Sequence, residues 1–266
     1  MSNNEHWVGE REPPLPLSFL MHTKAATPRR PSFVLCEDRA MPSALVTGGS
    51  SGIGLAIARM LREDGYALTL AGRKLERLEA AREGLDAAIV QADVSAEEDC
   101  GRLVAEHVEL HGGLNVLVNS AGVGIAGTVG DTTTKAWDLQ QAVNLRGAFL
   151  VTRAALPHLR ATKGYVVNLA SIAGTLPTPG LAAYGASKAA LIALSRTLDR
   201  EEAAAGVRVT ALCPGFVDTP MTTWTGIPGD EMIAPEDCAE IVRALLRLTP
   251  YARVPVVVLE RAGGDV

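Results

Sequence analysis

Short runs of apolar residues alternate with longer amphipathic stretches from Ser43 to the end of the chain. The apolar runs are continuous and are not interrupted by polar residues at every second position. This pattern predicts strands that are buried on both faces of a parallel sheet. Seven such runs are found, at Ala44–Thr47, Ala67–Ala71, Ala87–Gln91, Leu114–Val118, Tyr165–Leu169, Val207–Leu212 and Val254–Leu259.

The stretches between these runs have helical periodicity and are long enough to cross over the sheet. The clearest lie at Ile53–Glu63, Leu75–Arg82, Glu97–His111, Leu181–Ala205 and Pro235–Leu248. Alternation of strand and helix predicts an α/β fold in which a doubly wound parallel sheet of about seven strands carries helices on both faces. We expect residues 41–266 to form this single domain.

Residues 1–40 differ from the rest of the chain. They hold five of the 15 prolines, and they show no periodicity. Such a segment buries too little apolar surface to offset the entropy lost on ordering, which predicts a disordered or poorly ordered extension. Acidic residues such as Glu10 and Glu12 argue against an organellar transit peptide, which is acid-poor.

Composition excludes several classes of protein. Of the 266 residues, 47% are hydrophobic and 21% are charged, and the net charge is −5. No segment concentrates basic residues, which argues against binding to nucleic acid, and no apolar run approaches the roughly 20 residues needed for a membrane span. The four cysteines are far apart, which favours free thiols in a reducing, cytoplasmic compartment. We expect Cys213, at the end of an apolar run, to be a buried structural thiol.

A glycine-rich turn follows the first apolar run. Thr47 leads into Gly48-Gly-Ser50-Ser51-Gly52-Ile53-Gly54, and an amphipathic helix comes next. A pyrophosphate needs a tight turn, a backbone that it can approach closely, and a helix packed near the strand, and glycines allow all three. The helix N-terminus directs free N–H groups at the anion. The sequence therefore predicts a dinucleotide site, with cofactor contacts from Gly48, Ser50, Ser51, Gly52, Ile53 and Gly54.

The spacing Thr-Gly-x-x-x-Gly-x-Gly is wider than the usual dinucleotide pattern, and it resembles the signature of the short-chain dehydrogenase/reductase family. The resemblance covers residues 43 to about 260. It implies a Rossmann-type fold, a nicotinamide cofactor, oxidoreductase activity and assembly into a homodimer or homotetramer.

The end of the second apolar run bears on the choice of cofactor. Gly72 stands where a carboxylate would bind the ribose hydroxyls of NAD, and Arg73 follows it. Arg73 offers a permanently charged planar donor that suits a 2′-phosphate. The sequence therefore favours NADP(H), with NAD(H) as the alternative.

A proton donor or acceptor is predicted at Tyr184. Residues four apart share one face of a helix, so Lys188 can lower the pKa of the Tyr184 phenol from its ordinary value of about 10. Ser171, which follows the fifth apolar run, can hydrogen-bond the substrate oxygen. The family resemblance adds Asn144 as a fourth catalytic residue that holds a proton-relaying water, and it implies that Lys188 also reaches the cofactor ribose.

Three further segments match the cofactor-binding positions of the family. Each follows an apolar run, at the strand end where open α/β sheets bind ligands. The expected contacts are Asp93 and Val94 toward the adenine, Asn119, Ala121 and Gly122 after the fourth run, and Pro214, Gly215, Val217 and Thr219 toward the nicotinamide carboxamide. Ser120 stands where the family more often has a second asparagine.

Other signals carry less. His107 and His111 have the i, i+4 spacing of metal ligands, but no third ligand is evident, and we expect favourable charge at a helix end instead. No metal is required, because Lys188 is itself a cation. Trp137 and Trp224 are expected to pack in the core or in a substrate pocket.

These features together predict reversible hydride transfer between NADP(H) and a carbonyl or secondary alcohol. A non-catalytic NAD(P)-binding scaffold or redox sensor is the alternative, although binding alone does not need Ser171, Tyr184 and Lys188. An adenosylmethionine-dependent methyltransferase would share the glycine turn but leave these three residues unexplained. The segment from Pro214 to Pro235 is short, which predicts an open pocket for bulky or carrier-linked small-molecule substrates.

Overall fold

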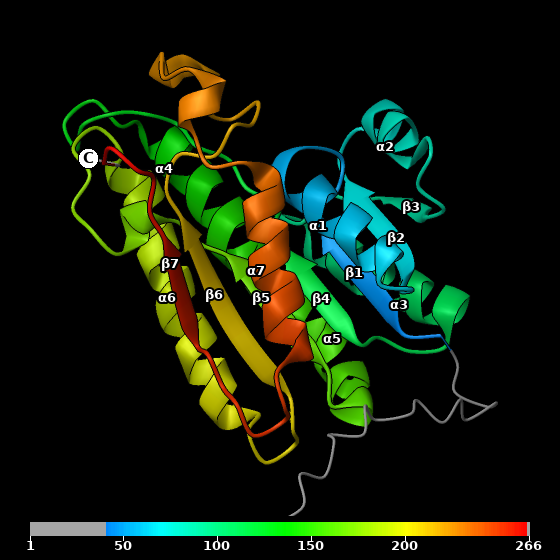
Figure 1. The fold of residues 1–266 in the computed structure, drawn as a ribbon. Coiled ribbons are helices and arrows are strands. Elements are labelled where there is room, and N and C mark those ends of the chain that lie inside the picture. The colour runs from blue at the N-terminus through cyan, green and yellow to red at the C-terminus, as the bar shows by residue number, and fades with distance from the viewer. Residues whose placement is uncertain (1–40, 265–266) are drawn as a thin grey trace, which may run out of the picture. The chain divides into compact units, whose positions relative to one another are not determined.

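A seven-stranded parallel sheet is the centre of the computed structural model, which describes residues 41–264 (Figure 1). The strand order is β3-β2-β1-β4-β5-β6-β7. The first three strands are therefore added toward one edge of the sheet and the last four toward the other, and the order changes between β1 and β4. Every pair of neighbours is parallel. The strands are β1 Ser43–Thr47, β2 Ala67–Gly72, β3 Ala88–Gln91, β4 Val116–Asn119, β5 Tyr165–Leu169, β6 Arg208–Pro214 and β7 Val256–Leu259.

Helices cover both faces of the sheet, as the alternating pattern predicts. One core cluster packs α1, α2 and α7 on one face, and a second packs α3 and α5 on the other. The helices are α1 Gly52–Glu63, α2 Leu75–Arg82, α3 Glu97–His111, α4 Thr134–Gln141, α5 Ala148–Thr162, α6 Ala182–Glu201 and α7 Pro235–Arg247. The predicted Rossmann-type α/β fold is confirmed.

The first strand shows why the apolar runs are continuous. Side chains alternate between the two faces of a strand, and in β1 Ala44 and Val46 join one core cluster while Leu45 joins the other. All three are completely buried. Both faces of the sheet therefore require apolar residues, which confirms the interpretation of the sequence pattern.

The region between β4 and β5 is less regular than the rest of the domain. A π-helical stretch, Ala142–Gly147, joins α4 to α5. None of the helices named from the sequence lies in this region. A β-carbon on Gly147 would lie 2.9 Å from the Val94 side chain and 3.0 Å from the Val94 carbonyl oxygen. Glycine at this position therefore lets the π-helical stretch approach the loop after β3. This is a long-range contact that a local sequence pattern does not predict.

The two histidines of α3 have a structural role different from the one predicted. His107 is completely buried, and its ring nitrogens lie 2.9 Å from the Thr69 hydroxyl and 3.2 Å from the Ser43 hydroxyl. Burial lowers the pKa of His107 to about 4. His107 is therefore neutral near pH 7, and the prediction of a favourable helix-end charge is wrong for it. Residues 41–264 contain no cluster of three or more His, Cys, Asp or Glu side chains suited to a metal.

The cysteines agree with the prediction of free, structural thiols. Cys100, Cys213 and Cys238 are buried and unpaired, and burial raises the pKa of Cys213 to about 11. Within residues 41–264, no helix is both long and apolar enough to cross a bilayer. Cys36 and the predicted disordered extension over residues 1–40 lie outside the described part of the chain.

Candidate functional site

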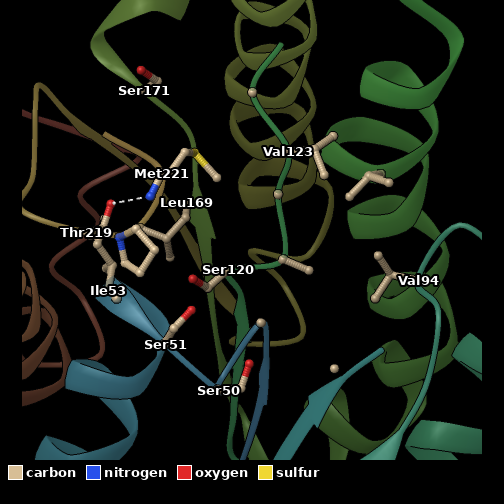
Figure 2. Close-up of a pocket in the computed structure, with 18 of the residues that line it drawn as sticks. Ser50, Ser51, Ile53, Val94, Ser120, Val123, Leu169, Ser171, Thr219 and Met221 are labelled. Carbon is tan, nitrogen blue, oxygen red and sulfur yellow. Dashed lines mark hydrogen bonds between the residues drawn. The ribbon is translucent and has the colours of Figure 1, made fainter. Parts of the chain in front are cut away.

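A cavity of about 630 Å³ opens at the carboxyl ends of the strands, where the order of the sheet reverses. Figure 2 shows Ser50 and Ser51 toward one side of it and Ser171 on another. The strand-end segments predicted to meet at one edge of the sheet do meet there. Predicted residues that line the cavity are Gly48, Ser50, Ser51, Gly52, Ile53, Arg73, Asp93, Val94, Ala121, Gly122, Ser171, Tyr184, Lys188, Pro214, Gly215, Val217 and Thr219.

The glycine turn brings three loops together. Gly48 has φ +65°, and a β-carbon on it would lie 2.7 Å from the backbone nitrogen of Ala121. Gly52 has φ +53°, and its β-carbon would lie 3.0 Å from the Thr219 side chain. Only glycine suits both positions. The first turn of α1 opens on the cavity at Gly52 and Ile53, where backbone N–H groups have no partner within the helix. This cradle fits a pyrophosphate.

One end of the cavity is basic. Arg73 and Lys74, between β2 and α2, and Arg77, in the first turn of α2, line it and are exposed. Within residues 41–264 no carboxylate forms an ion pair with any of the three. A β-carbon on Gly72 would meet only ordinary contacts at 3.5 Å or more. Steric crowding therefore does not explain why position 72 is a glycine. Because position 72 carries no carboxylate, it does not repel an anion bound at this end of the cavity.

Ser171, Tyr184 and Lys188 line another end of the same cavity. Ser171 follows β5, whereas Tyr184 and Lys188 lie one turn apart on α6. The Lys188 ammonium nitrogen lies 5.6 Å from the centroid of the Tyr184 ring and donates a hydrogen bond of 2.6 Å to the Leu169 carbonyl oxygen. The helical spacing therefore places the two side chains on one face, as predicted.

The pKa of Tyr184 is shifted in the direction opposite to the prediction. Burial raises it above the ordinary value, and a side-chain hydrogen bond with Ser171 acts in the other direction. Burial also lowers the pKa of Lys188 to about 8. The two shifts have one cause, because a dry environment disfavours both the phenolate and the ammonium. In this structure Tyr184 is therefore a protonated donor at neutral pH.

Asn144 lies behind the cavity and joins two of its walls. Its Oδ1 accepts from the Val123 backbone nitrogen at 2.8 Å, and its Nδ2 donates to the Val123 carbonyl oxygen at 2.9 Å and to the Ser187 hydroxyl at 3.0 Å. The Ser187 hydroxyl in turn donates to the Tyr184 carbonyl oxygen at 2.7 Å. The carboxamide thus has protein partners at both ends, and the predicted water-holding role of Asn144 stays a prediction.

Asn119 and Gly54 also lie outside the cavity lining. The Asn119 Nδ2 donates to the Thr152 hydroxyl at 2.9 Å and to the Asn168 Oδ1 at 2.8 Å, so it ties β4 to β5 and α5 in the core. A β-carbon on Gly54 would lie 2.5 Å from the Gly48 carbonyl oxygen. Both residues shape the site from behind, and neither reaches its surface.

Asp93 lines the cavity but also stabilises its own loop. Its Oδ1 accepts hydrogen bonds from the Ser95 backbone nitrogen at 2.9 Å and from the Ser95 hydroxyl at 2.7 Å. The helix that follows begins at Glu97, so its N-cap is Ala96. Asp93 therefore also orders the turn that precedes α3.

The segment after β6 lines a second, smaller cavity, and the predicted open pocket stays a prediction. This cavity has a volume of about 80 Å³ and shares Ser171 and Tyr184 with the larger one. Phe216, Met221 and Trp224 of the segment line it. Met221 also lines the larger cavity, and Figure 2 shows its backbone nitrogen bonded to the Thr219 hydroxyl. Met221 and Trp224 line the cavity while remaining 43% and 60% exposed.

Sequence reasoning missed Lys74 and Arg77 at the basic end and Met221 at the covering segment. The spacing of Arg73 and Arg77 is a signal that it could have used, since residues four apart near a helix start face the same way. Trp224 is confirmed in a pocket-lining position, where it makes an edge contact with Phe216 at 6.3 Å between ring centroids.

Comparisons with known proteins agree with this geometry. The family model described as short chain dehydrogenase matches residues 42–226. An uncharacterized oxidoreductase of Staphylococcus epidermidis is 38% identical over 202 residues, which cover 75% of this chain and 88% of the relative.

Two solved structures share the fold closely. An alcohol dehydrogenase from the archaeon Thermococcus sibiricus, complexed with 5-hydroxy-NADP, has a TM-score of 0.77 and 33% identity, over 82% of this chain and 96% of that one. A short chain dehydrogenase from Burkholderia cenocepacia in complex with NADP has a TM-score of 0.78 and 32% identity, over 86% of this chain and 99% of that one.

Proposed function

This chain belongs to the short chain dehydrogenase family, and on that basis we propose that it transfers a hydride reversibly between NADP(H) and a carbonyl or secondary alcohol. The observation that carries the proposal is a single cavity with a basic end at Arg73 and a proton-donor end at Tyr184. A cofactor that must present its phosphate at one place and its nicotinamide at another fits such a cavity.

The preference for NADP(H) over NAD(H) rests on the charges near Gly72. Arg73, Lys74 and Arg77 supply three cations where a 2′-phosphate would lie, and position 72 supplies no carboxylate to repel it. Two of the similar structures contain NADP or a derivative of it, which supports the same choice.

The nicotinamide would supply the hydride, and the protein would supply the proton and the orientation. In carbonyl reduction Tyr184 donates its phenolic proton to the developing alkoxide, and Ser171 hydrogen-bonds the same oxygen. Lys188 stabilises the phenolate left on Tyr184 by its nearby positive charge. Alcohol oxidation reverses the transfer, with Tyr184 as the base. Burial favours the protonated phenol, which is the form that donates the proton in carbonyl reduction.

Further residues have supporting parts in this proposal. The glycine turn with Ser50, Ser51 and Ile53 holds the pyrophosphate, and Asp93 and Val94 contact the adenine. Ala121, Gly122, Pro214, Gly215, Val217 and Thr219 line the nicotinamide side. Asn144 and Asn119 act from behind, through the backbone of Val123 and through the core.

The test follows oxidation of NADPH and of NADH over a panel of ketones and aldehydes, with Tyr184→Phe alongside. The matched control is Tyr251→Phe, since Tyr251 is 97% exposed and lines neither cavity. Tyr184→Phe should abolish turnover while leaving cofactor binding in place, and Tyr251→Phe should change neither. Unimpaired turnover in Tyr184→Phe would remove the phenol from the mechanism. Cofactor binding without turnover of any carbonyl would favour the scaffold alternative.

A further inference from the structure

The smaller cavity, next to Ser171 and Tyr184, has no charged side chain in its lining. Its walls come from three loops that follow β4, β5 and β6, together with the start of α6. The residues are Gly124, Ala126, Ser171, Ile172, Ala173, Thr178, Leu181, Tyr184, Gly215, Phe216, Met221, Thr222 and Trp224. A substrate group placed here meets apolar surface, three aromatic rings and a few hydroxyls.

The loops that form this cavity carry acidic side chains and no basic ones. The three loops, at residues 123–133, 172–183 and 215–234, contain four carboxylates and no lysine, arginine or histidine. The carboxylates belong to Asp131, Asp218, Asp230 and Glu231, and all four residues are exposed. An anionic substrate group would therefore approach through a field of its own sign.

Among residues 41–264, no cation lines the smaller cavity to compensate for that field. Lys188 is 4% exposed, and its ammonium already donates to the Leu169 carbonyl oxygen. The three cations of the basic end line the larger cavity and are absent from the lining of the smaller one. Arg261 follows β7 and is absent from the lining of the smaller cavity, and its guanidinium donates to backbone carbonyls, including that of Glu231.

We infer that the substrate of the reaction proposed above is an uncharged ketone, or the matching secondary alcohol, with a compact apolar substituent, and that carboxylates and phosphate-bearing carriers are rejected. An anionic group would lose hydrating water on entering the smaller cavity, and it would find hydroxyls there but no cation to compensate for its charge. The volume of about 80 Å³ limits the size of the substituent. The edge contact between Phe216 and Trp224 offers aromatic surface on one wall. This inference rests on the proposed function, and it narrows the range of substrates that the short segment after β6 suggests to small, uncharged ones.

Three ketones of the same heavy-atom count separate charge from shape. They are isobutyl methyl ketone, which is apolar, acetoacetamide, which is polar and uncharged, and acetoacetate, which is anionic. We expect kcat/KM with NADPH to fall in that order. The step from the amide to the carboxylate should be about 100-fold, because burying a charge without a cation beside it costs a factor of that order. Equal or better turnover of acetoacetate would overturn the inference while leaving the proposed function intact.

A cation added at the rim gives a second, independent readout. Thr178 lines the cavity and is partly exposed, so Thr178→Lys should reduce the preference for the amide over the carboxylate by about tenfold. Thr178→Met, a side chain of similar length without charge, should leave that ratio unchanged. Comparing this ratio between the variant and the wild type cancels the different intrinsic reactivities of the two ketones. An unchanged ratio in Thr178→Lys would count against the inference.

Binding distinguishes failure of this inference from failure of the proposed function. The same three ketones can be titrated by NMR into protein saturated with NADP⁺, where no hydride is available for reduction. Weaker binding of acetoacetate than of acetoacetamide, with no turnover of any of the three, would support the neutral pocket and reject the oxidoreductase chemistry. Equal binding of the two would reject the neutral pocket whatever the turnover shows.

Discussion

Lys188 lies over Tyr184, with its ammonium nitrogen 5.6 Å from the centroid of the phenol ring, and it is held there by a bond to the Leu169 carbonyl oxygen. Burial acts on the two groups in opposite directions, raising the pKa of the phenol and lowering that of the ammonium to about 8. The pair therefore combines a protonated phenol with a cation that loses its charge just above neutral pH.

The first prediction concerns the pH dependence of carbonyl reduction. Lys188 is charged below its pKa of about 8 and neutral above it, so kcat/KM should be level near pH 7 and decline above pH 8. Lys188→Arg should lower activity and move the decline to higher pH, because a guanidinium stays charged. Lys135→Arg, an exposed change on α4, is the control. A decline that stays at the same pH in Lys188→Arg would mean that another group titrates.

The second prediction concerns Ser187 as a positioning residue. Its hydroxyl joins the Asn144 carboxamide to the Tyr184 carbonyl oxygen. Ser187→Ala should cost about 1 kcal/mol of stability and lower kcat several-fold, with KM for NADPH little changed. Ser195→Ala is a matched control, because Ser195 is equally buried on the same helix but bonds Asn168 and Leu191 instead. Both variants should lose stability by a similar amount. Equal kcat in the two would reduce Ser187 to a structural residue.

The third prediction concerns the phosphate of the cofactor. Arg73→Ala and Arg77→Ala should each raise KM for NADPH by about tenfold or more, because each removes a charge-assisted hydrogen bond. KM for NADH, which has no 2′-phosphate, should change little. Arg82→Ala, at the far end of α2 and outside the cavity lining, should affect neither cofactor. Losses of the same size for both cofactors would contradict the assignment of this end of the cavity.

The fourth prediction concerns stability in mild acid. The pKa of buried His107 is lowered to about 4, against an ordinary value near 6.5. Between these values the unfolded chain binds the proton and the folded chain does not, so the stabilisation is complete above pH 6.5 and is lost as the pH falls toward 4. Chemical denaturation should show a loss of about 2 kcal/mol at pH 5 relative to pH 7.5 from this group.

His107→Gln should remove that loss, at the expense of lower stability at pH 7.5. His158→Gln is the comparison variant and should change the loss little, since His158 is the smallest of the causes that lower the pKa of His107 and makes no bond to Ser43 or Thr69. A pH dependence that persists in His107→Gln would assign it to other groups, the neighbouring His111 first among them.

Much of the fold follows from local pattern. The runs that form β1 and β5 are apolar at every position because both faces of the sheet are covered. Helix ends such as that of α3, where Gly112 takes φ +75°, follow from a single residue type. The π-helical stretch Ala142–Gly147 does not, because its geometry depends on contacts with Val123 and Val94 from distant parts of the chain.

The motifs of the candidate site could also be predicted from sequence, because Gly48–Gly54 and the pair Tyr184 and Lys188 are each short, local patterns. The surroundings of these residues could not be predicted from sequence. The direction of the Tyr184 pKa, the core-facing side chain of Asn119 and the small cavity under Trp224 all depend on which residues come from other strands and loops.

The amino-acid sequence on its own determined the order of strands and helices, the glycine turn and the identities of most groups that line the cavity. Only the tertiary structure decided how dry those groups are, which cations share one end of the cavity and how much space the substrate side leaves. Hydrophobic periodicity and helical spacing are local properties of a chain, whereas burial and electric field are sums over neighbours that folding brings together.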